Sequence, residues 1–142
     1  MSTDRVSYDP DARLLAVGER KYPAQQIASS DVELPTGGRF NSRVVRVVME
    51  NGYQLSVLWG SGTYSTNYEH SFGAAEFVED PLLVECAVIS PTKEFVPIDG
   101  TGDIVAGYCS TSDVQRLIAA VSQLSTSDVP ESVPFMLGEV AS

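Results

Sequence analysis

The feature that most constrains this sequence is a pair of β-rich segments joined by an Asn-Gly turn. Residues 43–49 (RVVRVVM) and 54–59 (QLSVLW) flank Asn51 and Gly52. Asn-Gly between two such segments is the strongest short-range signal for a β-hairpin, and it favours a type I′ turn with positive φ at both central residues. The first segment is apolar on both faces except for Arg46, which indicates a central strand.

The side chains of the second segment alternate, so that one face is apolar and the other carries Gln54 and Ser56. Four aromatic or aliphatic side chains share the apolar face: Tyr53, Leu55, Val57 and Trp59. Further strands are predicted at 82–89, which Pro91 closes, at 94–96 and at 103–108.

One helix is predicted after these strands. Ser112 as N-cap and Gln115 three residues later fit a capping box. An apolar stripe at helical spacing follows: Val114, Leu117, Ile118, Val121 and Leu124. The predicted fold class is therefore α+β, an antiparallel β-sheet of about five strands with one C-terminal helix packed on a face.

The chain of 142 residues fits a single compact domain with two flanking segments. Residues 1–38 are predicted as an N-terminal β/turn extension with a strand at 13–17, and Gly37-Gly38 separates it from a core domain at 39–124. Residues 125–142 contain two prolines and three acidic residues, so we expect an extended or disordered tail.

The formal net charge is −10 and is unevenly distributed. Residues 1–46 hold seven Lys/Arg against six Asp/Glu, giving +1, whereas residues 47–142 hold two against thirteen, giving −11. This field repels a phosphate backbone, so nucleic-acid binding is disfavoured. The acidic surface either keeps the protein soluble or attracts a basic partner. The sequence shows no apolar run of about 20 residues and no signal peptide, so we expect a cytoplasmic location and no membrane contact.

The sequence offers little for catalysis or metal binding. His70 is the only histidine and lies beside Glu69 in the polar loop 60–75. A triad with Ser61 or Ser65 would need adjacent residues to orient one another, and the motif around Ser61 is no nucleophile elbow. Cys86 and Cys109 are too far apart for a CxxC motif and suit buried positions. We predict no catalytic residue, no metal site, no cofactor and no enzymatic activity.

One group of residues is suited to binding. Aromatic side chains between small hydroxyl residues combine stacking area with hydrogen bonding, as binding sites do. The predicted ligand- or partner-binding residues lie at the hairpin end and in the long loop: Tyr53, Trp59, Tyr64, Tyr68, Phe72 and Arg46. The alternative is that Tyr53 and Trp59 belong to the core and that the loop tyrosines only fasten the loop.

Three segments carry a resemblance to a known family. Residues 49–57 (MENGYQLSV) resemble a "FENGYGVSV" hairpin, residues 84–89 (VECAVI) a "YELAVL" strand, and residues 103–108 (DIVAGY) the start of a "DDVIGYLTEEEV" ending. This order is similar to that in a family of short, uncharacterised tailed-phage proteins, over roughly residues 40–124. The resemblance implies a phage or prophage origin, so the expected location is the host cytoplasm, and it implies no particular activity.

These observations leave three functions open. The first is a small acidic phage accessory protein that binds and neutralises or modulates a host protein without catalysis. The second is a protein that binds or sequesters a small nucleotide-type ligand through the aromatic loop and Arg46. The third is a minor virion or assembly component, in which exposed strand edges would support a homo-oligomer.

Overall fold

The computed structural model describes residues 4–33, 35, 39–60, 63–66, 78–99 and 103–135. The described residues form eight strands and one helix: β1 (Val6–Asp9), β2 (Leu14–Val17), β3 (Arg20–Glu33), β4 (Arg39–Val48), β5 (Gln54–Gly60), β6 (Val84–Ile89), β7 (Phe95–Val96), β8 (Val105–Cys109) and α1 (Thr111–Ser122). Among these residues, no helix is long and apolar enough to cross a membrane.

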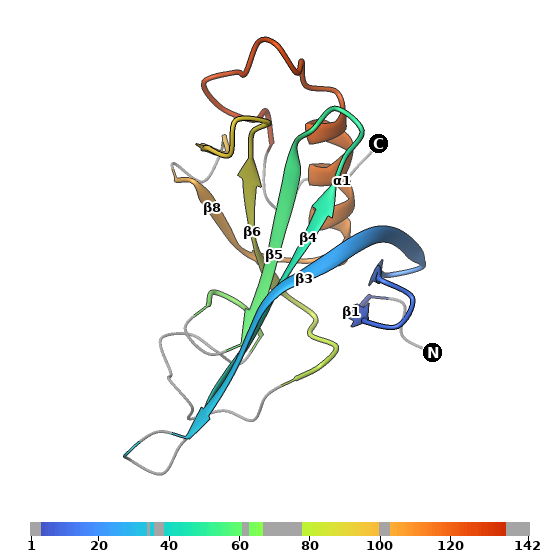
Figure 1. Cartoon of the computed structure of the whole chain (residues 1–142), viewed down its shortest axis with the longest axis vertical. Helices are drawn as coiled ribbons and strands as arrows, with labels where there is room; N and C mark the ends of the chain where they lie inside the picture. The colour runs from blue at the N-terminus through green and yellow to red at the C-terminus, as the bar shows by residue number, and fades with distance from the viewer. Residues whose placement is uncertain are drawn as a thin grey trace.

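The strands form one sheet in which every described pairing is antiparallel. The order is β1-β2-β3-β4-β5-β6-β7, and β8 pairs with β6. The sheet curls around α1, which covers its inner face (Figure 1). The α+β class, the antiparallel order and the C-terminal helix are thus confirmed, and β4 is the central strand that its sequence indicated.

The predicted number of about five strands is wrong, because the sheet has eight within the described residues. The five strands predicted after residue 38 correspond to β4, β5, β6, β7 and β8, and the strand predicted at 13–17 corresponds to β2. The prediction missed β1 and β3. Much of β3 is polar and lacks a clear alternation (RKYPAQQIASSDVE), so pairing with β4, rather than local propensity, stabilises it.

The Asn-Gly hairpin is present, but its type I′ turn is not. Gly52 has a φ of 88°, whereas Asn51 is not among the residues with positive φ. Gly52 N donates to Met49 O (3.0 Å), and Met49 N donates to Tyr53 O (2.9 Å). This is the three-residue loop in which a turn is followed by a glycine in the left-handed region. The extra residue turns the Asn51 side chain toward the helix.

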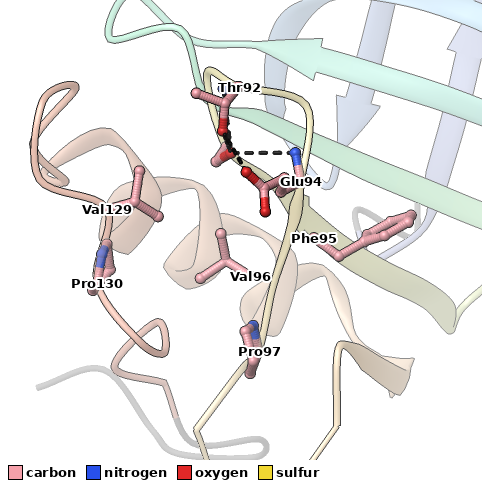
Figure 2. Close-up of a pocket in the computed structure, with 8 residues that line it drawn as sticks. Thr92, Glu94, Phe95, Val96, Pro97, Val129 and Pro130 are labelled. Carbon is pink, nitrogen blue, oxygen red and sulfur yellow. Dashed lines mark hydrogen bonds between the residues drawn. The ribbon is translucent and has the colours of Figure 1, made fainter.

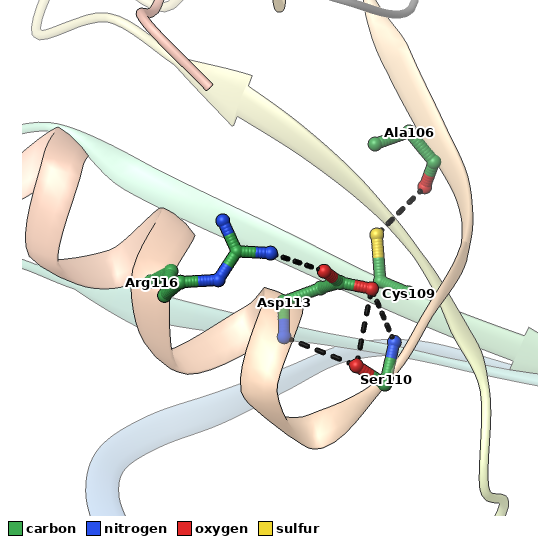
Figure 3. A network of polar contacts seen from close by, with 5 residues as sticks. All are labelled: Ala106, Cys109, Ser110, Asp113 and Arg116. Atoms are coloured by element: carbon green, nitrogen blue, oxygen red, sulfur yellow. Dashed lines mark hydrogen bonds and ion pairs between the residues drawn. The ribbon is translucent and has the colours of Figure 1, made fainter. Parts of the chain in front are cut away.

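The capping of the helix lies two residues earlier than predicted. Ser110, not Ser112, is the N-cap, and Asp113, not Gln115, is its partner at the third helical position. Ser110 Oγ accepts from Asp113 N (3.2 Å), and Ser110 N donates to Asp113 Oδ2 (3.0 Å), as Figure 3 shows. Aspartate serves here in place of the Glu or Gln of the usual pattern. The predicted apolar stripe is confirmed, since its first four members are buried and Leu124 is partly buried.

Both terminal segments contribute to the core. Val6, Leu15 and Val17 from β1 and β2 lie in the same apolar cluster as the helix. Residues 125–135 form no helix or named strand, yet Val133 and Phe135 are buried. Val133 N donates to Pro97 O (2.8 Å), and Asp99 N donates to Val133 O (2.9 Å), which fastens this segment beside β7. The rest of the predicted tail, residues 136–142, lies outside the described residues.

Candidate functional site

The residues predicted to bind a ligand do not form one cluster. Tyr53 and Trp59 are fully buried on the inner face, in the core cluster. Arg46 is on the opposite, outer face of the sheet, and Tyr64 is 41% exposed beside β8. Tyr68 and Phe72 lie outside the described residues, as does His70. The structure therefore separates the two buried aromatics of the predicted site from its exposed members.

Tyr53 and Asn51 join the hairpin to the end of the helix. Asn51 Nδ2 donates to Val121 O (2.9 Å) and Leu124 O (3.1 Å), the carbonyls left open where α1 ends. Tyr53 Oη donates to Ser125 O (2.8 Å). Burial, with the charge of Asp128 as a second cause, raises the pKa of the Tyr53 hydroxyl. These contacts give both residues a structural role in the fold.

Tyr64 covers one corner of the sheet. Its amide donates to Glu85 Oε1 (3.1 Å), its carbonyl accepts from Tyr108 N (2.8 Å), and its ring meets that of Tyr108 edge-on at 6.0 Å. The backbone of Gly107 lies beneath it, and a Cβ at that glycine would be only 2.7 Å from Tyr64 Cβ. The pKa of the Glu85 carboxyl is raised, and burial is the largest cause. The hydrogen bond from the Tyr64 amide lowers this pKa, whereas repulsion by Asp103 raises it further.

The larger remaining surface is the side of the sheet that faces away from α1, here called the outer sheet face. Strand alternation and register assign these side chains of β4 to β8 to it: Val44, Arg46, Val48, Gln54, Ser56, Leu58, Glu85, Ala87, Ile89, Phe95 and Val105. None of them belongs to the core cluster. Most are apolar or small, although a solvated face of an antiparallel sheet is normally polar.

Two cross-strand rows define the centre of this face. In the first, Val48 pairs with Gln54, Gln54 with Ile89, and Ile89 with Phe95. Val48 and Phe95 at the two ends are 56% and 54% exposed, whereas Ile89 between them is 3% exposed. Three apolar side chains and Gln54 thus form one row across four strands, and its exposed apolar ends are a feature of interaction surfaces.

The second row is centred on Arg46. Arg46 pairs with Ser56, Ser56 with Ala87, and Ala87 with Val105. Ser56 and Ala87 are buried although they lie outside the core cluster. Arg46 Nε is buried and has no hydrogen-bond partner. A buried donor without an acceptor is uncommon.

A hollow adjoins the first row where β7 begins. It has a volume of about 290 Å³ and lies between the β6–β7 hairpin and residues 129–130. Figure 2 shows Val96 beside Val129 and Pro130, while the ring of Phe95 points to the other side of β7. Glu94 and Thr92, whose side chains are hydrogen-bonded to each other (3.2 Å), form the polar rim.

The nucleophilic and acidic groups near the helix start have structural partners. Cys86 and Cys109 are buried thiols, and Cys109 Sγ donates to Ala106 O (3.3 Å). A hydrogen bond with Cys109, together with burial, raises the pKa of the Cys86 thiol well above its usual value, so it carries no thiolate near neutral pH. Asp113 is held by Ser110 and Arg116, as Figure 3 shows. Within the described ranges no group of three or more acidic, Cys or His side chains could hold a metal ion.

Of the outer sheet face, Arg46 was among the predicted binding residues, whereas Val48, Phe95 and the other members were not. Its signal was present in the first hairpin strand, which is apolar on both faces. Comparison with protein-family models, with curated proteins and with solved structures found no match.

Proposed function

We propose that this chain is a non-catalytic accessory protein that binds a host protein through the outer sheet face. The observation that supports this most strongly is the row from Val48 to Phe95, which leaves two large apolar side chains more than half exposed on either side of a buried isoleucine. Exposed apolar rows of this kind are covered in complexes, because burial of apolar area is the main favourable term in association.

The charge of the molecule favours a basic partner. The net charge is −10, and Glu85, Glu94 and Asp103 border the apolar rows. An acidic surface around an apolar centre accelerates the approach of a basic protein, whereas the apolar contact itself sets how slowly the complex dissociates. Arg46 adds one positive charge to the same surface, which would attract a carboxylate of the partner.

Two further considerations support a host protein as the partner. The resemblance to tailed-phage proteins implies an infected bacterium as the setting, where a small non-catalytic phage protein would act by binding. The hollow at Val129 lies on the other side of β7 from the Phe95 ring, and it would receive apolar side chains from a part of the partner that passes around the end of β7.

The test is affinity capture from a lysate of the bacterial host with matched variants. Wild type and Leu82→Asp, a change at a 36% exposed position away from the apolar rows, should retain the same basic protein, and Phe95→Asp should lose it. A charge at the end of the apolar row would have to be buried without a partner. Retention should fall at high salt because steering is screened. The proposal fails if no host protein is retained under gentle conditions, or if Phe95→Asp retains it equally.

A small anionic ligand is the second candidate, and one observation favours it. A hollow of about 350 Å³ lies between β3 and α1, lined by Arg20, Tyr22, Gln115, Arg116, Ile118 and Ala119. Two arginines line this hollow, and because the Arg116 guanidinium is paired with Asp113, Arg20 is the residue that would meet an anion. Nucleotides should then raise the melting temperature of wild type more than that of Arg20→Gln. A flat response across the nucleotides would eliminate this candidate.

A further inference from the structure

Strand β7 pairs with β6 along one side, which leaves its other edge for a different neighbour. In an antiparallel pair, residues whose N–H and C=O face the neighbouring strand alternate with residues whose groups face away from it. Ser90 N donates to Glu94 O (2.8 Å) across the hairpin, and Ile89 pairs with Phe95 at the next position. The N–H and C=O of Phe95 therefore point away from β6, toward the outer edge of β7.

The same edge is occupied farther along the chain by Val133. Val133 N donates to Pro97 O (2.8 Å), and Asp99 N donates to Val133 O (2.9 Å), which makes a parallel pairing beside Ile98. The next step of this ladder toward Phe95 would need an N–H at Pro97, and proline has none. The pairing ends there, and the N–H and C=O of Phe95 are left without a partner among the described residues.

The hollow of about 290 Å³ lies beside this unpaired position. Phe95 is one of the residues that line it, although its ring points to the other side of β7, so the main chain of Phe95 borders the hollow (Figure 2). Val129 and Pro130 form the opposite wall, and Val96 and Pro97 add further apolar surface. Apolar walls beside an unpaired N–H and C=O are features of sites that accept an extended peptide as an added strand.

The border of the hollow is acidic. Glu94 lies on the β7 side, Asp128 and Glu131 flank the opposite wall, and all three residues are exposed. Residues 90–97 and 128–133 together hold one lysine against these three acidic residues, a net charge of −2. Such a border attracts Lys and Arg side chains and repels an acidic peptide.

We propose that this hollow binds an extended, basic segment of the partner protein, which adds to the edge of β7 as a short strand. One residue of the segment exchanges both main-chain hydrogen bonds with Phe95. The next residue points to the opposite face and places an apolar side chain between Val96 and Val129, while flanking Lys or Arg side chains meet Glu94 and Glu131. This assignment rests on the proposed function for the identity of the partner, whereas binding of the segment alone can be measured without that protein.

The probe is a peptide selected from a random library against the immobilised full chain, with peptides of about six residues, the usual length of a strand. The tightest binder is labelled with a fluorophore and titrated with wild type and variants. Val129→Lys places a charge in the apolar wall and should weaken binding by about tenfold or more. Leu82→Lys is the matched control, because Leu82 is 36% exposed and Val129 39%, and it should bind the peptide like wild type.

Main-chain pairing is tested from both sides of the contact. Phe95→Pro removes the N–H on an edge where proline is tolerated, whereas Phe95→Ala removes only the ring, so the proline variant should bind about tenfold more weakly than the alanine variant. Methylation of successive peptide amides tests the same contact with wild-type protein, and methylation of one amide should abolish binding. The bound peptide should also slow hydrogen exchange of the Phe95 amide and leave that of Val48 unchanged.

Three results overturn the proposal. The first is a library that yields no binder, and the second is a peptide that binds Val129→Lys as tightly as wild type. The third is equal binding by Phe95→Pro and Phe95→Ala together with a peptide in which no amide is sensitive to methylation. Host capture gives a separate answer: a host protein that is lost by Phe95→Asp but retained by Val129→Lys would preserve the proposed function and eliminate the added strand.

Discussion

Strands β4, β5 and β6 place apolar side chains on both faces of one sheet, but only the inner face has a partner within the described chain. Val47 on the inner face is 3% exposed, and Val48, the next residue, is 56% exposed. Both are valines in the same strand, so residue type does not distinguish them. The difference is that α1 covers one face and nothing of comparable size in the described chain covers the other. The inner face should therefore determine stability and the outer face binding.

The largest stability loss should come from removing the centre of the inner face. Leu117 is completely buried in the helix stripe, and Leu117→Ala leaves a cavity that the surrounding sheet cannot refill. We expect the free energy of unfolding to fall by about 3 kcal/mol, measured by urea denaturation. Leu82→Ala, at a 36% exposed leucine, is the control and should cost far less. Equal losses in the two variants would show that the helix does not organise the core.

The sequence identified this inner face well because its signals are local. Side-chain alternation in β5 and the helical stripe from Val114 to Val121 each involve residues close in sequence, and both are buried as predicted. The turn at Asn51 shows where local reasoning ends. The Asn-Gly pair located the hairpin, but the side chain of Asn51 bonds carbonyls 70 or more residues away, and no local pattern encodes that contact.

The outer sheet face and β3 were harder to predict for two different reasons. An apolar strand such as β4 indicates that both faces can be buried, but the sequence does not state whether the second partner is another part of the chain or another molecule. Strand β3 has no clean alternation, and its pairing with β4 depends on a neighbour rather than on its own propensity. The Tyr64 and Arg46 positions of the predicted site are exposed or partly exposed, whereas Tyr53 and Trp59 belong to the core.

The next largest effect should come from the contact that ends the helix against the hairpin. Asn51→Ala removes two donor contacts from partly buried carbonyls and should cost about 1–2 kcal/mol. Asn51→Asp retains the oxygen that accepts from Tyr53 N (3.2 Å) but places a negative charge at the negative end of the helix. Urea denaturation at about pH 7 should therefore find the aspartate variant no more stable than the alanine variant. If Asn51→Asp is as stable as wild type, the donor role is refuted.

A smaller effect on stability should come from Glu85, an acidic residue on the outer sheet face. Its folded pKa is raised, so the folded state binds the proton more tightly than the unfolded chain does. The contribution of Glu85 therefore lowers the free energy of unfolding as the pH rises from the usual pKa of 4.5 to the raised pKa of the folded state. Above the folded-state pKa this loss of stability is complete and no longer changes with pH. Because the side chain is only half-buried, solvent screening limits the effect, and Glu85→Gln should stabilise by on the order of 0.5 kcal/mol at about pH 7.

The pH dependence separates this cause from packing. Glutamine can still accept the Tyr64 amide, so the two proteins should melt at the same temperature near about pH 3, where Glu85 is protonated. Thermal melts under acidic and neutral conditions provide the measurement. Stabilisation of equal size in both would mean that shape, and not the buried charge, distinguishes glutamate from glutamine here.

The smallest effect should come from Val48, the exposed one of the two neighbouring valines. Val48→Thr replaces a methyl group by a hydroxyl in water and should change the free energy of unfolding by less than about 0.5 kcal/mol. Val47→Thr makes the same change one residue earlier, where the hydroxyl is buried against apolar neighbours, and should cost about 1–3 kcal/mol. Urea denaturation of the two variants measures the difference between the faces directly. If both lose the same stability, the outer sheet face is packed against something in the free protein, and it would not be available to a partner.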